Sequence, residues 1–176
     1  MNLIETLQEN KDRIRSTWIE RTLDSYTSSG FFKKSLDTIA NPIGSNIRAG
    51  LSDLLDLLLR KAHPEEYDKP LDQVIRIRAV QDFSPSRAVV PFLELKWVIR
   101  QILRDDPALG LTKELDQLDC DIDRLALAAF DKYMECREQL YQVRIRELKS
   151  GSYILSDAPC PSSLAGKGVE DGNSIN

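Results

Sequence analysis

Apolar residues recur every three or four positions along most of the chain, and polar residues fill the positions between them. That spacing is typical of amphipathic helices, whereas strands alternate with a period of two. It predicts helices over residues 2–26, 42–60, 71–83, 85–104 and 111–148, with residues 31–32 in a connection and 63–67 in a loop. We therefore expect an all-α fold, a single bundle of about five helices with a long last helix and a disordered tail.

Two of these helices carry clear start signals. Asn41 and Ser84 are predicted N-caps, because each has a side-chain oxygen that can accept a backbone N–H and each precedes a proline. A proline is tolerated at the first helical position, since its missing N–H would have no partner there. Pro91 instead falls inside the fourth helix, where it removes one backbone hydrogen bond. It predicts either a kink near residues 87–91 or two shorter helices.

The last helix is expected to be too long for the rest of the bundle to cover. Its apolar residues follow one another in steps of four and three, as in a coiled-coil seam, and the helix would reach roughly 55 Å. A small bundle does not cover that length, so the half from about Tyr133 onward is expected to project and meet a partner chain. The candidate seam of a homodimer comprises Tyr133, Cys136, Leu140 and Val143. Residues 150–176, rich in Ser, Gly and Pro, are expected to form a disordered tail behind a domain over residues 1–149.

One segment holds polar residues that helix periodicity and capping do not require. Arg76, Arg78, Gln81 and Asp82 precede the second capped turn, and Lys96 on the fourth helix is a candidate for the same network. Arg78 and Asp82 have the i,i+4 spacing at which a guanidinium pairs with a carboxylate on one helix. Such a group can act as an internal polar lock between helices, or it can be a sensing site for a ligand or partner. The sequence leaves both interpretations open.

Composition narrows the classes of function. A chain of 176 residues forms one domain by default, and its net charge of −4 and pI near 5.1 argue against a nucleic-acid partner. No apolar run approaches the roughly 20 residues that a membrane-spanning helix needs, and the N-terminus lacks a signal-peptide pattern. We therefore expect a cytoplasmic protein without direct membrane insertion. Three cysteines without C-x-x-C spacing support neither a disulfide framework nor a zinc site.

No residue pattern predicts catalysis or a bound cofactor. The only histidine, His63, lies at a helix end, where it can interact with the helix dipole, and the sequence does not identify the partners of a haem ligand or a general base. The aspartates at positions 116, 119, 121 and 123 lie opposite an apolar stripe, so a solvated face is favoured over a metal site. Phosphate loops, nucleophile elbows and Ser-His-Asp sets are absent from the sequence. We expect a protein that is not an enzyme and holds no cofactor.

Four motifs occur in order along this chain, namely Asn41-Pro-Ile-Gly44, the run from Arg76 to Ser86, Leu95-Lys96 and Phe130-Asp-Lys-Tyr133. Over residues 3–149 they resemble the RsbRD N-terminal domain family. The resemblance implies an all-helical, dimeric input module like those of the RsbT co-antagonists, which build the stressosome that controls a general-stress sigma factor. Some of those input domains are globin-like without haem, which is one alternative arrangement for this bundle.

The resemblance also bears on partners and output. In the co-antagonists the last helix leads into a STAS domain whose phosphorylation carries the output, whereas about 27 residues follow that helix here. We therefore expect a stand-alone sensory or protein-interaction module without that output domain, and the sequence does not name its protein partner. An alternative is an accessory binding protein of a respiratory or sulfur-metabolism redox complex at a membrane, because stand-alone relatives occur near such genes.

Overall fold

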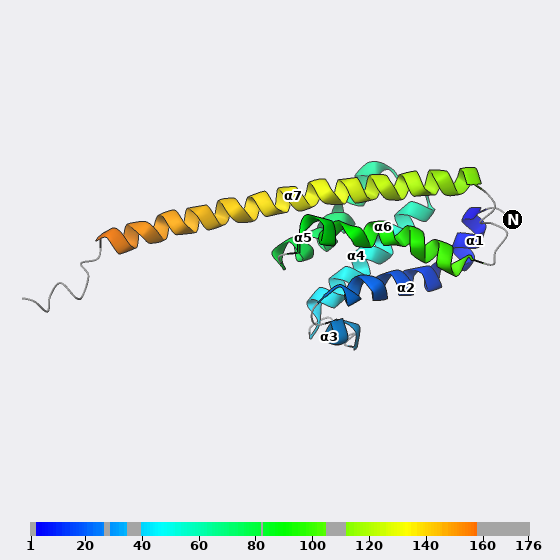
Figure 1. Ribbon diagram of the computed structural model, residues 1–176, viewed down its shortest axis with the longest axis horizontal. Helices are drawn as coiled ribbons and strands as arrows, with labels where there is room; N and C mark the ends of the chain where they lie inside the picture. The colour runs from blue at the N-terminus through cyan, green and yellow to red at the C-terminus, as the bar shows by residue number, and fades with distance from the viewer. Residues whose placement is uncertain (1–2, 27–28, 35–39, 82, 105–111, 158–176) are drawn as a thin grey trace, which may run out of the picture. The chain divides into compact units, whose positions relative to one another are not determined.

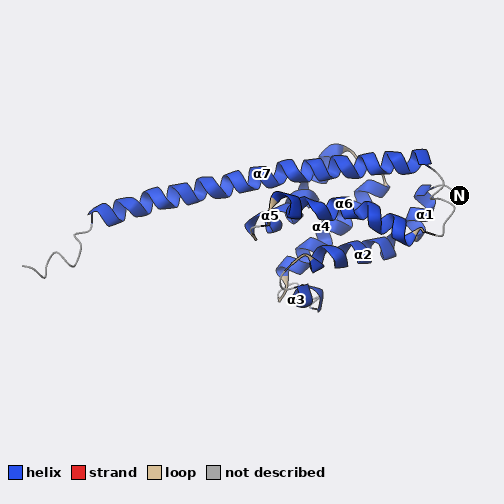
Figure 2. Ribbon diagram, viewed as in Figure 1, coloured by secondary structure: helices blue, strands red, loops and turns tan. Residues whose placement is uncertain are grey.

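The computed structural model describes residues 3–26, 29–34, 40–81, 83–104 and 112–157, and every regular element in these ranges is a helix (Figure 2). The elements are α1 Leu3–Glu9, α2 Lys11–Asp24, α3 Ser29–Lys34, α4 Pro42–Leu59, the 3-10 helix η1 Pro64–Tyr67, α5 Asp68–Val80, α6 Pro85–Ile102 and α7 Thr112–Asp157. The predicted all-α fold with a long C-terminal helix is confirmed. The predicted disordered tail, apart from its first residues in α7, lies outside the described residues.

The described residues contain more helices than the sequence predicts. The first predicted helix is divided at Asn10, whose φ and ψ are −97° and 6° and whose Nδ2 donates to the Thr6 carbonyl oxygen at 3.0 Å. The predicted connection after it is helix α3, in which Phe32 packs edge-on against Tyr26 with ring centroids 5.5 Å apart. The predicted loop before α5 is η1, and α5 begins and ends earlier than the predicted 71–83. Periodicity missed the short elements because it needs several turns of helix to show.

Both predicted N-caps are confirmed. Asn41 Oδ1 accepts the Gly44 N–H at 2.9 Å, and Ser84 Oγ accepts the Arg87 N–H at 3.4 Å. The first of these caps also restricts the residue at position 44, because a Cβ atom there would lie 2.4 Å from Asn41 Nδ2. Local capping chemistry therefore sets the starts of α4 and α6.

The chain divides into two units, Met1–Glu138 and Gln139–Asn176, and the division falls within the range of α7. The domain boundary after residue 149 stays a prediction. In the first unit, α2 packs on α4 and on α6, and α4 packs on α5 (Figure 1). The largest fully buried side chains of this unit are apolar, Trp18 and Phe92 among them, with the exception of Arg78. Within the described ranges, the helices offer no segment both long and apolar enough to cross a membrane.

Candidate functional site

The residues of the predicted polar group do not lie in one place. Arg78 is buried in the core with 0% of its surface exposed, whereas Arg76 is exposed and its Nε lies 2.5 Å from Asp72 Oδ2 on the same helix. Lys96 belongs to α6, and its Nζ lies 2.6 Å from Asp123 Oδ1 of α7. Three separate environments therefore hold the three cations.

The remaining two residues of that group lie at the end of α5. Gln81 is the exposed C-cap residue of the helix. Asp82 lies outside the described residues, so the expected pairing of Arg78 with Asp82 stays a prediction. Of the predicted group, Arg78 is the residue whose burial calls for an explanation, because a charged side chain rarely lies fully inside a core without specific partners.

The Arg78 guanidinium is held by oxygen atoms and aromatic rings from three parts of the chain. Nη1 and Nη2 each donate to Ser25 Oγ at 3.1 Å, and Nη2 also donates to the Arg87 carbonyl oxygen at 2.7 Å. The guanidinium carbon lies 4.3 Å from the centroid of the Phe83 ring and 5.0 Å from that of Tyr26, both within the range of cation–π attraction. These contacts join the end of α2, the turn between α5 and α6, and the first turn of α6.

Pro91 explains why a buried donor is needed at this position. In a regular helix the Arg87 carbonyl would accept the N–H of the residue four positions later, but that residue is Pro91, which has no N–H. Arg78 Nη2 supplies the missing donor. The carbonyl of Pro91 in turn accepts the indole Nε1–H of Trp18 at 2.7 Å. Helix α6 accordingly runs as one element through the proline, and the alternative of two shorter helices is wrong.

Burial shifts the titration of both polar groups inside this site. It lowers the pKa of the Arg78 guanidinium, and the neighbouring Tyr26 opposes that shift. Arginine starts from so high a pKa that it stays charged at neutral pH. Burial likewise raises the pKa of Tyr26, against the influence of the positive charge on Arg78, so the phenol stays protonated. The site is therefore a permanent buried cation that two rings, a hydroxyl and a main-chain carbonyl stabilise.

Helix α7 binds the same turn from the other side. The Tyr133 hydroxyl donates to the Phe83 carbonyl oxygen, and Arg137 Nη1 donates to the Ala79 carbonyl oxygen at 3.1 Å. The Phe83 N–H donates to the Arg78 carbonyl oxygen at 3.4 Å, which closes the end of α5. We define the α5–α6 junction as the segment from Arg78 to Arg87 together with these contacts. It receives donors both from the core and from α7.

The residues of the predicted dimer seam lie in two different environments. Tyr133 and Cys136 are buried in the core of the first unit, and burial raises the pKa of the Cys136 thiol. Leu140 and Val143 belong to the second unit and are 38% and 45% exposed. The heptad spacing thus follows the face that α7 uses within its own chain as far as Cys136. Only the latter pair is accessible to a second copy.

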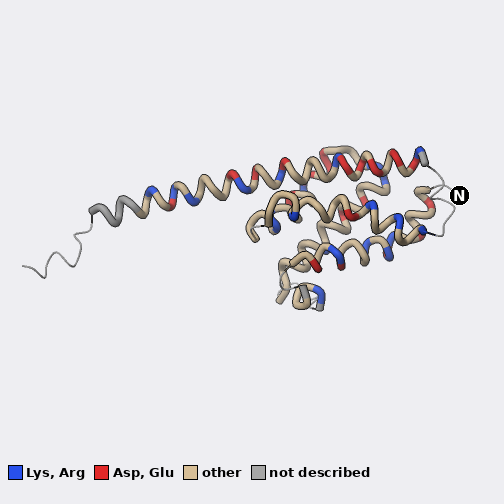
Figure 3. Tube along the Cα trace, in the orientation of Figure 1, with Lys and Arg blue, Asp and Glu red and all other residues tan. Residues whose placement is uncertain are grey.

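The other polar residues that the sequence offers as candidate ligands, His63 and the aspartates of α7, have structural roles. His63 is exposed and starts η1, where its backbone N–H donates to Glu66 Oε1 at 3.0 Å. Acidic residues gather along the first turns of α7 (Figure 3), and Asp119 there pairs with Arg100 of α6 at 2.5 Å. In the part of the chain that the structure describes, no group of three potential ligands could hold a metal ion.

Sequence reasoning did not single out Ser25, Tyr26 or Arg137. The first two lie some fifty positions before Arg78 in the chain and reach it only through tertiary packing. One signal was available in the sequence, because a proline inside a helix frees the carbonyl four residues before it, and a buried carbonyl needs a donor. Pro91 and Arg78 could have been connected on that ground.

Comparison with known proteins agrees with this all-helical architecture. The family model described as the RsbT co-antagonist protein rsbRD N-terminal domain matches residues 12–148, which include all of the α5–α6 junction. No curated protein matches the chain. No solved structure matches it either. The match covers most of the chain, which therefore belongs to the RsbRD N-terminal domain family, a family of regulatory sensory domains.

Proposed function

We propose that this chain is a non-enzymatic sensory and protein-interaction module of the stressosome type, which dimerises through its C-terminal helix and passes a signal along it. Membership of the RsbRD N-terminal domain family supports the regulatory role. The observation that carries the dimer is the composition of the helix in the second unit. The proposal assigns the junction a coupling role and the second unit an assembly role.

The helical part of the second unit exposes large apolar side chains close together in sequence. They are Leu140, Tyr141, Val143, Ile145 and Leu148, each between 38% and 68% exposed. Tyr141 and Leu148 are seven residues apart with Ile145 between them, which places these three on one helical face. Leu140 and Val143 lie on another face. A helix that is apolar on more than one side needs further apolar surface to cover it, and a coiled coil or bundle with a second copy provides that.

The charged residues of the same segment include both signs, which is compatible with a second copy of this chain as the partner. Arg144, Arg146 and Lys149 are positive and Glu147 is negative, so both signs lie among the apolar positions, with the cations in excess. Flanking charges of both signs allow a helix to pair with an identical helix through crossed ion pairs. An isologous dimer uses one surface twice, and this mixed pattern is compatible with such self-pairing.

The α5–α6 junction supports the signalling part of the proposal. Tyr133 and Arg137 bind its carbonyl groups, and both residues precede the start of the second unit by only a few positions in the sequence. A change in the backbone of the junction would move the two acceptors that hold α7. The structure thus offers a physical connection between the core of the first unit and the helix that leads into the second.

Size-exclusion chromatography with light scattering tests the dimer. We expect the full chain to have the mass of two copies at high micromolar concentration and Ile145→Glu to have the mass of one, because a second copy that covers this apolar face would bury the new carboxylate without a partner. Ser150→Glu is the matched control, since it adds the same charge at an exposed polar residue of the same segment, and it should stay dimeric. A full chain that remains a monomer at this concentration would contradict the proposal.

A further inference from the structure

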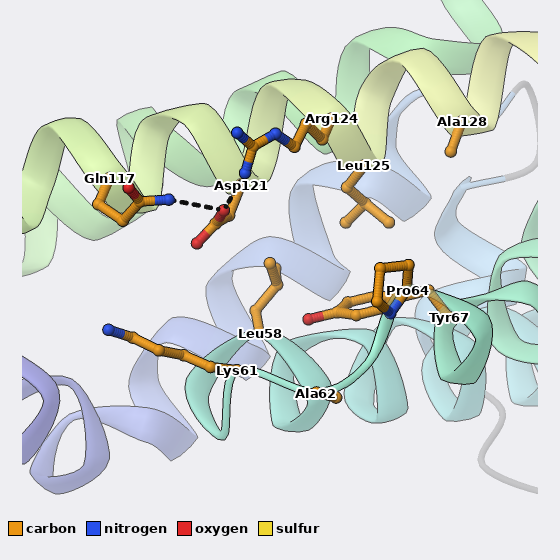
Figure 4. A pocket seen from close by; sticks show the side chains of 10 residues that line it. All are labelled: Leu58, Lys61, Ala62, Pro64, Tyr67, Gln117, Asp121, Arg124, Leu125 and Ala128. Carbon is orange, nitrogen blue, oxygen red and sulfur yellow. Dashed lines mark hydrogen bonds and ion pairs between the residues drawn. The ribbon is translucent and has the colours of Figure 1, made fainter.

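A cavity of about 580 Å³ lies in the first unit, between the C-terminal end of α4 with η1 on one side and α7 on the other (Figure 4). Its walls include Leu58, Lys61, Tyr67, Gln117, Asp121 and Leu125. The volume is within the range of about 300–1,000 Å³ that is usual for sites that bind small molecules. The cavity does not include residues of the α5–α6 junction.

The polar and apolar groups of this cavity are separated. Figure 4 shows the Lys61 ammonium at the same end as the side chains of Gln117 and Asp121, whereas Tyr67 and Leu125 lie toward the other end. An elongated ligand with one polar head and an apolar body would match this distribution. The apolar end would remove the body from water, and the polar end would fix its orientation.

Lys61 is presented to the cavity by an unusual backbone. Its N–H donates to the Leu58 carbonyl at 3.2 Å and the Ala62 N–H donates to the Leu57 carbonyl at 3.0 Å, which is the Schellman arrangement at a helix end. Lys61 therefore occupies the position where glycine is most common, and its φ is 52°, in the left-handed region that disfavours a residue with a Cβ atom. Packing does not require a lysine here, since glycine would adopt this conformation more easily. A left-handed backbone at a residue with a Cβ atom makes the Lys61 side chain a candidate for a functional role.

The charges at the polar end favour an anion. The Asp121 carboxylate accepts a hydrogen bond from Gln117 Nε2 at 3.0 Å and pairs with Arg124 Nη1 at 3.0 Å, so its charge is already compensated. Among the described residues, Lys61 takes part in none of the ion pairs. The cavity thus combines an available cation with an apolar wall.

We propose that this cavity binds a small apolar monocarboxylate, with the carboxylate on the Lys61 ammonium and the alkyl or aryl body against Leu58, Tyr67 and Leu125. Such a ligand would contact the end of α4, η1 and α7 at once. The inference deepens the proposed sensory function by naming a class of signal. It does not depend on dimerisation, because all the residues involved belong to the first unit.

Titration calorimetry with hexanoate, hexanamide and hexylammonium on the full-length chain tests the proposal. We expect hexanoate to bind at least tenfold more tightly than the neutral amide and the cationic amine. Lys61→Gly should abolish that preference and at the same time raise the melting temperature, because glycine relieves the left-handed backbone. That combination separates loss of the site from loss of the fold. Lys69→Gln, which removes an exposed lysine that does not line the cavity, should bind hexanoate as the unmodified chain does.

Two results would overturn the inference. One is equal affinity for hexanoate and hexanamide, or no binding of either at millimolar concentration. The other is an undiminished preference for hexanoate in Lys61→Gly. Repeating the titration on Ile145→Glu distinguishes the two proposals, since a monomeric variant that still binds hexanoate would leave the cavity assignment standing whatever the state of the dimer.

Discussion

Arg78 and Pro91 should be energetically coupled, although they are thirteen positions apart in the sequence. The proline leaves the Arg87 carbonyl without its helical donor, and Arg78 Nη2 replaces that donor at 2.7 Å. We consider Arg78→Met, which keeps an unbranched side chain of similar length and removes all the guanidinium donors. In the background of Pro91→Ala, the backbone N–H at position 91 is restored, and the same substitution should be much less harmful.

The expected magnitude follows from the groups that lose their partners. A buried carbonyl left without a donor costs about 1–3 kcal/mol, and the cation–π contacts with Phe83 and Tyr26 contribute about 1–2 kcal/mol when desolvated. Against this, removing a buried charge relieves a desolvation penalty of several kcal/mol. The cation–π and desolvation terms are the same in both backgrounds and cancel, so we expect Arg78→Met to cost about 2 kcal/mol more alone than in the background of Pro91→Ala. The coupling energy is then about 2 kcal/mol, a range typical of residues that share one partner.

Urea unfolding of the four proteins of this double-mutant cycle, followed by far-UV circular dichroism, measures the coupling. All four are compared at one protein concentration, because association changes the apparent stability. Arg76→Met is the matched control, since Arg76 is exposed and makes one i,i+4 pair with Asp72, so its loss should cost less than about 1 kcal/mol. Additive effects of Arg78→Met and Pro91→Ala, within about 0.5 kcal/mol, would refute the role of Arg78 as the donor that the proline requires.

Two further substitutions test the packing and the electrostatics of α4. Gly50→Ala should destabilise the protein by about 1–3 kcal/mol in spite of the higher helix propensity of alanine, because its Cβ would lie 2.6 Å from Val74 Cγ2. A urea midpoint at or above that of the unmodified chain would contradict this expectation. Glu66 pairs with Arg60, and that hydrogen bond lowers the pKa of Glu66 below its ordinary value of 4.5. The stabilising contribution of this pair is therefore present above that pH and lost as the pH falls. Glu66→Gln should accordingly lose less stability between neutral and acidic pH than the unmodified chain does. Parallel pH profiles of the urea midpoint for the two proteins would show that the pair has no effect.

Features that depend on local chemistry could be predicted from the sequence, and features that depend on long-range packing could not. Asn41 and Ser84 could be identified as N-caps because the backbone N–H group that each one caps lies three residues later in the chain. The partners of Arg78 include Ser25, which lies 53 positions away, and no periodicity predicts that contact. The expected pairing of Arg78 with Asp82, which lies outside the described residues, stays a prediction.

The predicted dimer seam on α7 shows a second limit of prediction from the sequence. A heptad-like repeat of apolar residues shows which residues share a face of a helix, but not whether the same chain or a second chain covers that face. Tyr133 and Leu140 are one heptad apart, and the first is buried in its own chain while the second is exposed. Tyr133 and Cys136 are buried because they pack into the core of the first unit, so their burial depends on how far the other helices of that unit extend. That length is a property of the whole bundle and cannot be read from α7 alone.

The contacts at the α5–α6 junction share a feature that bears on signalling. The donors from Arg78, Tyr133 and Arg137 all bind main-chain carbonyl groups, at Arg87, Phe83 and Ala79. A main-chain carbonyl moves only when the backbone moves, whereas a side-chain acceptor can change rotamer and leave the backbone in place. Any displacement of the junction is therefore imposed on α7 through two fixed acceptors and on the core through a third. A helix held in this way would respond to the backbone of its neighbour, as the proposed signalling along α7 requires.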